Sequence, residues 1–139
     1  MSHQLILMID DHQPTLQIMS EFLLAEMDCQ VEVCNGELEQ IELIKRLHPS
    51  LVILDLVMPG LSGEQILELM KGDPEIAATP VLLWSASPVQ LGRIKPELLQ
   101  GRVDCLGKPF GLEELLQKIQ QLQDATDLES EQVSALSSA

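Results

Sequence analysis

The sequence predicts an α/β fold in which five parallel strands form a doubly wound sheet of order 2-1-3-4-5. Three observations lead to this prediction. Short apolar runs alternate along the chain with segments of helical hydrophobic period, which is typical of a parallel sheet covered by helices on both faces. Residues 51–54 are apolar at every position, as in a strand buried on both faces. Acidic or hydroxyl residues follow three of the runs, at the strand ends where open α/β sheets bind their ligands.

The first strand and the first helix occupy the N-terminal part of the chain. Residues 4–9 form an apolar strand that ends at the acidic pair Asp10 and Asp11. Pro14 suits the first turn of the following helix, because its missing N–H costs nothing there. Apolar residues then recur at helical spacing to about Met27, which indicates one amphipathic helix.

The second strand is expected at an edge of the sheet. Val31 and Val33 alternate with polar neighbours, which is the pattern of a strand with one exposed face. Apolar positions within residues 38–47 follow the helical period, and His48-Pro49 ends that helix. This part of the chain therefore predicts a strand, a turn and a second helix.

The central strand ends in a carboxylate. Asp55 follows the apolar residues 51–54, and residues 58–60 then give a turn signal. Ser62 and Gln65 have capping-box spacing at the start of the third helix. The apolar positions expected on the buried side of this helix are Ile66, Leu69 and Met70. An acid between a buried strand and a turn is a candidate for chemistry.

The fourth strand leads into a segment that does not suit a regular helix. Residues 81–84 are apolar and are followed by Ser85, which places a hydroxyl at a strand end. Gly92 and Pro96 interrupt residues 87–100. Inside a helix, Gly costs about 1 kcal/mol and Pro about 3 kcal/mol relative to Ala. We therefore expect a short or broken fourth helix that is split before Pro96.

The fifth strand and the last helix complete the predicted fold. Residues 103–107 form the strand, which ends just before Lys108, and residues 112–122 form a helix with one apolar face. From residue 124 onward the chain is acidic and has few large apolar side chains. We therefore expect one domain over residues 1–123 and an acidic, disordered tail over residues 124–139.

Composition excludes several classes of function. The 139 residues suffice for one domain with a sizeable core. The net charge of −14 opposes direct binding to nucleic acid, which depends on basic side chains. The apolar runs are far shorter than the roughly 18 residues of a membrane span, and the beginning of the chain lacks the basic region of a secretory signal. We expect a cytoplasmic protein whose three cysteines, which lack zinc-site spacing, are reduced thiols.

In the predicted topology, five polar side chains from four strand ends converge at one edge of the sheet. They are Asp10, Asp11, Asp55, Ser85 and Lys108. Carboxylates that lie together repel one another unless a cation joins them, and hard oxygen ligands suit Mg²⁺. A lysine opposite the metal leaves a gap suited to a phosphoryl group. Asp55 can attack phosphorus there to give an acyl phosphate, while Ser85 donates a hydrogen bond to a phosphoryl oxygen.

From about residue 4 to residue 122, the chain resembles a receiver domain of the two-component response regulators. The resemblance rests on the motifs ILMIDDH, LVILDLVMPGLSG, LLWSA and GKPF, in this order and at family-like spacing. It implies a CheY-like fold of the flavodoxin type. It also implies a phosphoacceptor signalling domain that catalyses its own phosphorylation and dephosphorylation, and not an enzyme of metabolism.

The resemblance assigns roles to the acidic residues. It implies that Asp55 is the phosphoacceptor. Asp11 and Asp55 would then ligate Mg²⁺ directly, Asp10 would act mainly through water, and the Val57 carbonyl would supply a backbone ligand. Ser85 would be the switch hydroxyl and Lys108 the lysine that faces the phosphoryl group.

Two features depart from the family pattern. The aromatic switch residue expected on the last strand is replaced by Cys105, and the chain has no tyrosine. An aromatic side chain that swings inward cannot be the signal here. The irregular segment over residues 87–100 also belongs to the face that receivers use for output and dimerisation, so partner choice and oligomeric state are left open.

Three classes of function follow from these observations. The first is a stand-alone receiver that accepts phosphate from a histidine kinase or a histidine phosphotransfer protein and signals through a separate output protein. The second is an interaction module that works without phosphorylation. The third is a phosphohydrolase with an aspartyl nucleophile, and it is disfavoured because Val57 stands where that class has a second aspartate.

Overall fold

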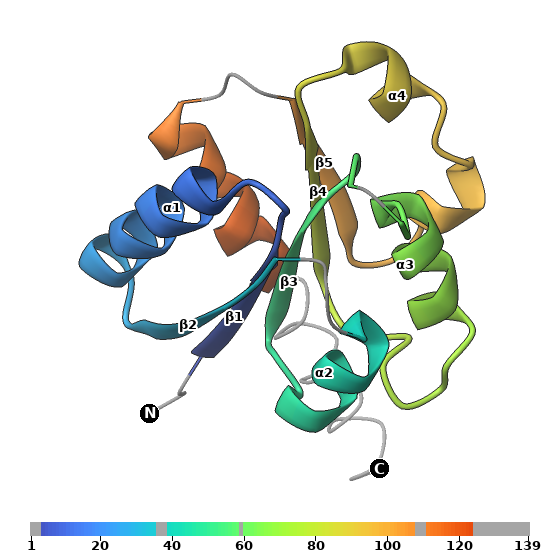
Figure 1. Ribbon diagram of the computed structural model, residues 1–139, viewed down its shortest axis with the longest axis horizontal. Coiled ribbons are helices and arrows are strands. Elements are labelled where there is room, and N and C mark those ends of the chain that lie inside the picture. Colours follow the sequence, from blue (N-terminus) through green and yellow to red (C-terminus); the bar gives the residue numbers. More distant parts are fainter. Residues whose placement is uncertain (1–3, 36–38, 59, 108–110, 124–139) are drawn as a thin grey trace, which may run out of the picture.

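The computed structural model describes residues 4–35, 39–58, 60–107 and 111–123 (Figure 1). Within these ranges, five parallel strands form one sheet of order β2-β1-β3-β4-β5, which confirms the predicted topology. The strands are β1 (Gln4–Ile9), β2 (Cys29–Cys34), β3 (Leu51–Asp55), β4 (Val81–Ser85) and β5 (Val103–Gly107). The helices are α1 (Gln13–Glu26), α2 (Gln40–Leu47), α3 (Gly63–Lys71), α4 (Pro88–Gly92) and the 3₁₀ helix η1 (Pro96–Leu99). A C-terminal helix follows over residues 112–123.

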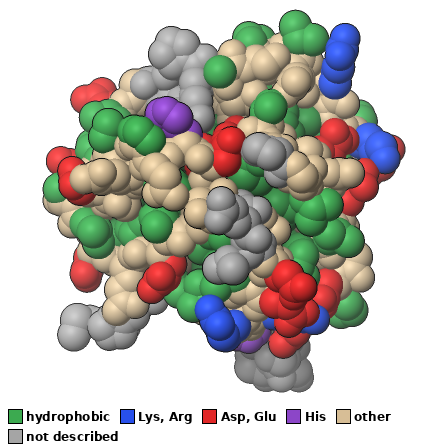
Figure 2. All heavy atoms as spheres, viewed as in Figure 1, with side chains coloured by type: hydrophobic (Ala, Val, Ile, Leu, Met, Phe, Trp, Pro, Cys, Tyr) green, Lys and Arg blue, Asp and Glu red, His purple; other side chains and the backbone are tan. Residues whose placement is uncertain are grey.

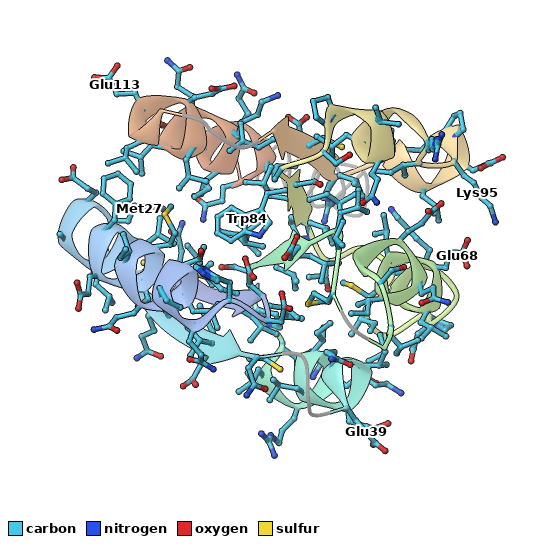
Figure 3. The ribbon with its side chains drawn as sticks, turned by 45° about the horizontal axis from the view of Figure 1, so that its top comes forward. Met27, Glu39, Glu68, Trp84, Lys95 and Glu113 are labelled. Atoms are coloured by element: carbon cyan, nitrogen blue, oxygen red, sulfur yellow. The ribbon has the colours of Figure 1, made fainter. Side chains whose placement is uncertain are left out.

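Helices cover both faces of the sheet. Figure 1 shows α1 and the C-terminal helix on one side, and α2 and α3 on the other. On the first side, Leu23 of α1 and Ile119 of the C-terminal helix share a buried cluster with Trp84, which lies between these two helices in Figure 3. On the second side, Ile44 of α2 and Ile66 of α3 belong to another buried cluster. The sheet therefore separates two hydrophobic cores.

Strand β3 lies at the centre of this arrangement. All five of its residues are buried, which confirms the interpretation of residues 51–54 as a doubly covered strand. Successive side chains point to opposite faces, so Ile53 packs in one core and Leu54 in the other. Leu54 is in register with Ile9 of β1, and Asp55 with Trp84 of β4. The carboxyl ends of β1, β3 and β4 consequently meet at one edge.

The buried side of α3 differs from the prediction at one position. The helix begins with the predicted capping box of Ser62 and Gln65. However, Leu69 is 49% exposed, and Leu67 is fully buried together with Ile66. On a helix of about 3.6 residues per turn, Leu69 lies roughly 100° from the centre of the face formed by Ile66, Leu67 and Met70. The apolar spacing alone did not distinguish these two faces.

The fourth helix is broken, as the sequence predicts. Helix α4 has five residues, and η1 begins at Pro96. The segment is fixed to the rest of the fold by Ile94 and Leu98, which are buried in the core beside α3. Lys95 adds an ion pair of 2.9 Å to Glu68 of α3, which Figure 3 shows on the neighbouring helix. Tertiary contacts thus hold a segment that has little helical stability of its own.

Two of the predictions concern residues that lie outside the described ranges. These are the position of Lys108 and the tail over residues 124–139. Among the helices of the described ranges, none is long and apolar enough to cross a membrane.

A substitution at Gly63 tests how closely the start of α3 approaches the end of β3. Its N–H donates to the Leu56 carbonyl at 3.0 Å. A Cβ atom built on Gly63 would overlap the Asp55 carbonyl oxygen and lie 2.8 Å from Leu56 Cα, both of which are backbone atoms that cannot rotate away. We expect Gly63→Ala to lower the free energy of unfolding by about 1–3 kcal/mol, the usual cost of overpacking, as measured by urea denaturation.

Gly72 offers the matched control at the other end of α3. Its backbone is in the right-handed helical region, and an added Cβ would approach no atom closer than 3.6 Å. Gly72→Ala should leave stability unchanged or raise it slightly, because it restricts the unfolded chain. Equal losses of stability in the two variants would show that the close approach at Gly63 is not the cause.

Candidate functional site

Three carboxylates lie together at the carboxyl ends of β1 and β3. One oxygen atom from each of Asp10, Asp11 and Asp55 lies within 4.8 Å of the other two. The side chains of Asp10 and Asp55 are buried, at 0% and 8% exposure, whereas Asp11 is exposed. Figure 2 shows red acidic side chains both at the middle of this face and around its margin, whereas the blue basic ones lie at the margin. The predicted convergence of the acids is confirmed.

The backbone holds both buried carboxylates at the strand exits. The N–H of His12 donates to Asp10 Oδ1 at 2.9 Å, and the N–H of Val57 donates to Asp55 Oδ1 at 3.2 Å. In each case an aspartate accepts from the amide two residues later, which is the local geometry of an Asx turn. The two acids are therefore oriented by the turns that follow their own strands.

Ser85 lies at the same edge of the sheet. It is the last residue of β4 and is 1% exposed. Asp55 is in register with Trp84, so Ser85 follows directly beyond the level of the Asp55 backbone. Ser85 Oγ accepts a hydrogen bond from the N–H of Ser87 at 3.0 Å. The hydroxyl is thus tied to the loop that leads into α4.

The donor set suits a small hard cation. Mg²⁺ binds oxygen at about 2.0–2.1 Å, so two oxygens on one ion lie at most about 4.2 Å apart. The three carboxylate oxygens, all within 4.8 Å of one another, are close enough to share one ion, some by direct contact and others through its bound waters. Three neighbouring carboxylates also repel one another until a cation is bound. The geometry and the charge of the site therefore fit magnesium.

A hollow of about 270 Å³ opens beside the acidic cluster. Its walls are formed by the turn after β3, the start of α3, and α4 with the residue that follows it. The lining residues are Leu56, Val57, Met58, Ser62, Glu64, Gln90 and Arg93. Gln90 and Arg93 were not predicted as neighbours of the site. Their positions depend on how the broken segment folds back over the sheet edge, and hydrophobic periodicity carries no signal for that.

Two further residues that the sequence points to are Lys108 and Cys105. Lys108 lies outside the described ranges, so its place opposite the acids stays a prediction. Cys105 is half-buried and packs against the core on the side of α2 and α3. Burial raises the pKa of its thiol, and the negative charge of Asp104 adds to the effect, while Lys118 opposes it. Cys105 is therefore expected to be a protonated thiol at neutral pH.

Comparison with known proteins identifies the family of this chain. The profile of the response regulator receiver domain matches residues 6–120. The chain belongs to this family. Protein PilG of Pseudomonas aeruginosa is 30% identical to this receiver over 115 residues, which cover 83% of the receiver and 84% of PilG. The receiver is also 30% identical over 125 residues to the DNA-binding dual master transcriptional regulator RpaA of Synechocystis, of which it spans 50%.

A solved structure supports the same conclusion about the fold. The chemotaxis protein CheY4 of Vibrio cholerae superposes with a TM-score of 0.74 at 22% sequence identity, covering 87% of this receiver and 99% of CheY4. The predicted CheY-like fold is confirmed. Receiver domains are signalling domains and not metabolic enzymes, and most of this chain is receiver domain.

The two half-buried cysteines allow a test of how neighbouring charges change the pKa of each thiol. Burial and the charge of Asp104 raise the pKa of Cys105, and burial and the charge of Asp28 raise the pKa of Cys29. Because the thiolate is the reactive form, both thiols should alkylate more slowly near pH 8 than a free cysteine. Asp104→Asn should lower the pKa of Cys105 and speed its reaction with iodoacetamide, as measured by peptide mass mapping over time.

Asp28→Asn serves as the matched control for this measurement. It should speed alkylation of Cys29 and leave Cys105 unchanged, whereas Asp104→Asn should do the opposite. If either substitution accelerated both thiols alike, general loosening of the fold would explain the result, and the assigned charge effects would be wrong.

Proposed function

We propose that this receiver accepts a phosphoryl group on Asp55 from a histidine kinase or a histidine phosphotransfer protein. The observation that carries the proposal is the grouping of carboxylate oxygens from Asp10, Asp11 and Asp55 within 4.8 Å, in a chain of the receiver family. The position of Ser85 at the end of the neighbouring strand supports it. The signal then passes to a separate partner protein in the cytoplasm.

The proposed reaction uses Asp55 as the nucleophile. A carboxylate oxygen of Asp55 forms a bond to phosphorus while the bond between phosphorus and the donor's leaving atom breaks, and the leaving atom keeps that electron pair. The N–H of Val57 holds Asp55 Oδ1, so the carboxylate is oriented before the donor arrives. Hydrolysis of the resulting acyl phosphate, by attack of water on phosphorus, returns the receiver to its starting state.

The acidic cluster is proposed to hold Mg²⁺. Asp11 and Asp55 would bind it directly, Asp10 through water, and Val57 through its carbonyl oxygen. When bound, Mg²⁺ neutralises charge that develops on the phosphoryl oxygens. Lys108 is proposed to provide the second positive charge at the phosphoryl group. This arrangement also explains why three acids are kept together at the cost of mutual repulsion.

Ser85 is proposed to report phosphorylation to the rest of the domain. Its oxygen accepts from the N–H of Ser87, and a hydroxyl that accepts can also donate its proton, here to a phosphoryl oxygen on Asp55. A Ser85 side chain drawn toward Asp55 pulls on the loop that ends at α4. The phosphate would thereby bias two positions of the α4 segment, which is how a covalent switch acts on a two-state domain.

Asp55→Asn is the direct test of the acceptor. Incubation of the protein with acetyl phosphate and Mg²⁺ should add the mass of one phosphoryl group, as read by intact mass spectrometry. The gain should disappear in Asp55→Asn and when the metal is chelated. Asp28→Asn, which removes an exposed acid just before β2, is the matched control and should be labelled like the native chain.

Labelling that persists in Asp55→Asn would place the acceptor elsewhere. No labelling of the native chain, under conditions that label a control receiver, would favour an interaction module that works without phosphorylation. In that case Asp55→Asn would also leave partner binding intact.

Metal binding can be followed through Trp84. This side chain is fully buried and in register with Asp55, so its fluorescence is expected to change as Mg²⁺ binds. Asp11→Asn should raise the apparent dissociation constant roughly tenfold, which corresponds to about 1.4 kcal/mol. An identical titration curve in Asp11→Asn and in the control Asp28→Asn would contradict the assigned ligand.

A further inference from the structure

The hollow beside the acidic cluster lies next to the turn that follows Asp55. Leu56, Val57 and Met58, the three residues after Asp55, form one part of its lining. The N–H of Val57 donates to Asp55 Oδ1 at 3.2 Å, so the lining begins at a residue bonded to the proposed nucleophile. The volume of about 270 Å³ is near the lower end of the usual size of small-molecule sites. A small molecule that reacts at Asp55 can therefore extend into this hollow.

The α4 segment supplies polar side chains to another wall of the hollow. These are Gln90 and Arg93. The N–H of Ser87 donates to Ser85 Oγ at 3.0 Å, and Ser87 Oγ accepts from the N–H of Gln90 at 3.2 Å. The N–H of Arg93 donates to the Gln90 carbonyl at 3.1 Å. A chain of hydrogen bonds thus ties the backbone of both residues to the end of β4, and it does not involve their side chains.

Arg93 is the basic residue among the described residues that line the hollow. It is exposed, and within the described ranges no ion pair or side-chain hydrogen bond engages its guanidinium group. Lys95, two residues later, is by contrast paired with Glu68 of α3 at 2.9 Å. Arg93 therefore keeps its donors for an anion that enters the hollow from solution.

Glu64 limits the kind of anion that the hollow accepts. It lies on the α3 wall, and its Oε1 accepts from the N–H of Lys95 at 3.4 Å. A negative group close to this wall would be repelled by the carboxylate. The residues after β3 that line the hollow are apolar. The lining therefore suits a ligand with a small apolar body and one negative group at the α4 wall, beside Arg93.

We propose that this hollow binds the leaving group of a small acyl phosphate and that Arg93 recognises the carboxylate which this donor releases. The inference rests on the proposed function of Asp55. An oxygen of Asp55 bonds to phosphorus, and the bond between phosphorus and the acyl oxygen breaks. The acyl oxygen keeps the electron pair, so the donor departs as a carboxylate anion.

The charge that develops on the leaving group explains the role of Arg93. The attacking and leaving oxygens lie roughly in line, so the carboxylate departs on the side away from Asp55. The planar fork of an arginine matches the two oxygens of a carboxylate, and Gln90 can donate to them from its side-chain amide. Because negative charge grows on this group as the bond breaks, Arg93 stabilises the transition state more than the intact donor. A donor with a neutral leaving group gains nothing from this arginine.

Two phosphodonors with different leaving groups test the proposal. Acetyl phosphate releases acetate, whereas phosphoramidate releases ammonia. The rate of phosphoryl gain is measured by intact mass spectrometry with Mg²⁺ at constant ionic strength. Arg93→Gln should slow labelling by acetyl phosphate roughly three- to tenfold, between the effects of losing an exposed ion pair and a charge-assisted hydrogen bond. Labelling by phosphoramidate should be unchanged, and Arg93→Lys should restore part of the rate with acetyl phosphate.

Arg46→Gln is the matched control for the loss of one positive charge. Arg46 is an exposed residue in the last turn of α2 and does not line the hollow, so both donors should label this variant like the native chain. Equal slowing of both donors in Arg93→Gln would show that Arg93 acts through general charge or through the fold. Unchanged labelling by acetyl phosphate would show that Arg93 does not contact the donor. Either result would overturn the proposal.

Acetate binding separates this inference from the proposed function. The full-length, ¹⁵N-labelled protein is titrated with sodium acetate, and sodium chloride at equal ionic strength is the reference. The amide signal of Gln90 should shift more with acetate than with chloride, and Arg93→Gln should remove the difference. Equal shifts with the two salts would overturn the inference even if both donors label Asp55. Labelling by neither donor, together with an acetate shift that depends on Arg93, would contradict the proposed function alone.

Discussion

The burial of two carboxylates at the junction of β1 and β3 is the constraint on which this structure depends. Asp10 and Asp55 are withdrawn from water at adjacent strand ends, and Asp11 adds a third acid to the same point. Hydrogen bonds from the following backbone support each buried acid, but they do not remove the repulsion between like charges. The pairing of Ile9 with Leu54 enforces this proximity, so folding of the hydrophobic sheet holds together charges that would otherwise separate. A site prepared in this way has a strong electrostatic reason to bind a cation.

Hydrophobic pattern was sufficient for the fold because each strand and helix has a local signal. The unbroken apolar run of β3 required cover on both faces, and Pro96 required a break in the fourth helix, and both predictions are confirmed. The hydrophobic pattern gave a wrong prediction where two faces of one helix carry similar side chains. Leu67 and Leu69 are both leucines of α3, and only the direction of the helix relative to the sheet determines which of them is buried. Sequence spacing does not contain that direction.

The acidic cluster could be predicted because a parallel sheet brings all its carboxyl ends to one edge. Asp10, Asp11, Asp55 and Ser85 needed only the strand order to be placed together. The lining of the hollow beside the acidic cluster could not be predicted from strand order alone. Gln90 and Arg93 reach this hollow through an irregular segment. Such loops have no periodic signal, so their contacts follow from tertiary structure alone, and the position of Lys108 stays a prediction.

Under the proposed function, the α4 segment would let a receiver with Cys105 transmit a signal without an aromatic switch. A five-residue helix is too short to be stable by itself, so its position depends on its contacts with the rest of the fold. Just beyond this helix, Lys95 and Glu68 form an exposed ion pair, and exposed pairs contribute little to stability. The hydrogen bond between Ser87 and Ser85, at the start of α4, contributes about 1 kcal/mol. Under the proposed function, a phosphoryl group that recruits Ser85 changes the hydrogen bond at the start of α4, while the buried Ile94 and Leu98 keep the far end of the segment in place. Displacement of the α4 backbone would then transmit the signal in place of a rotating aromatic side chain.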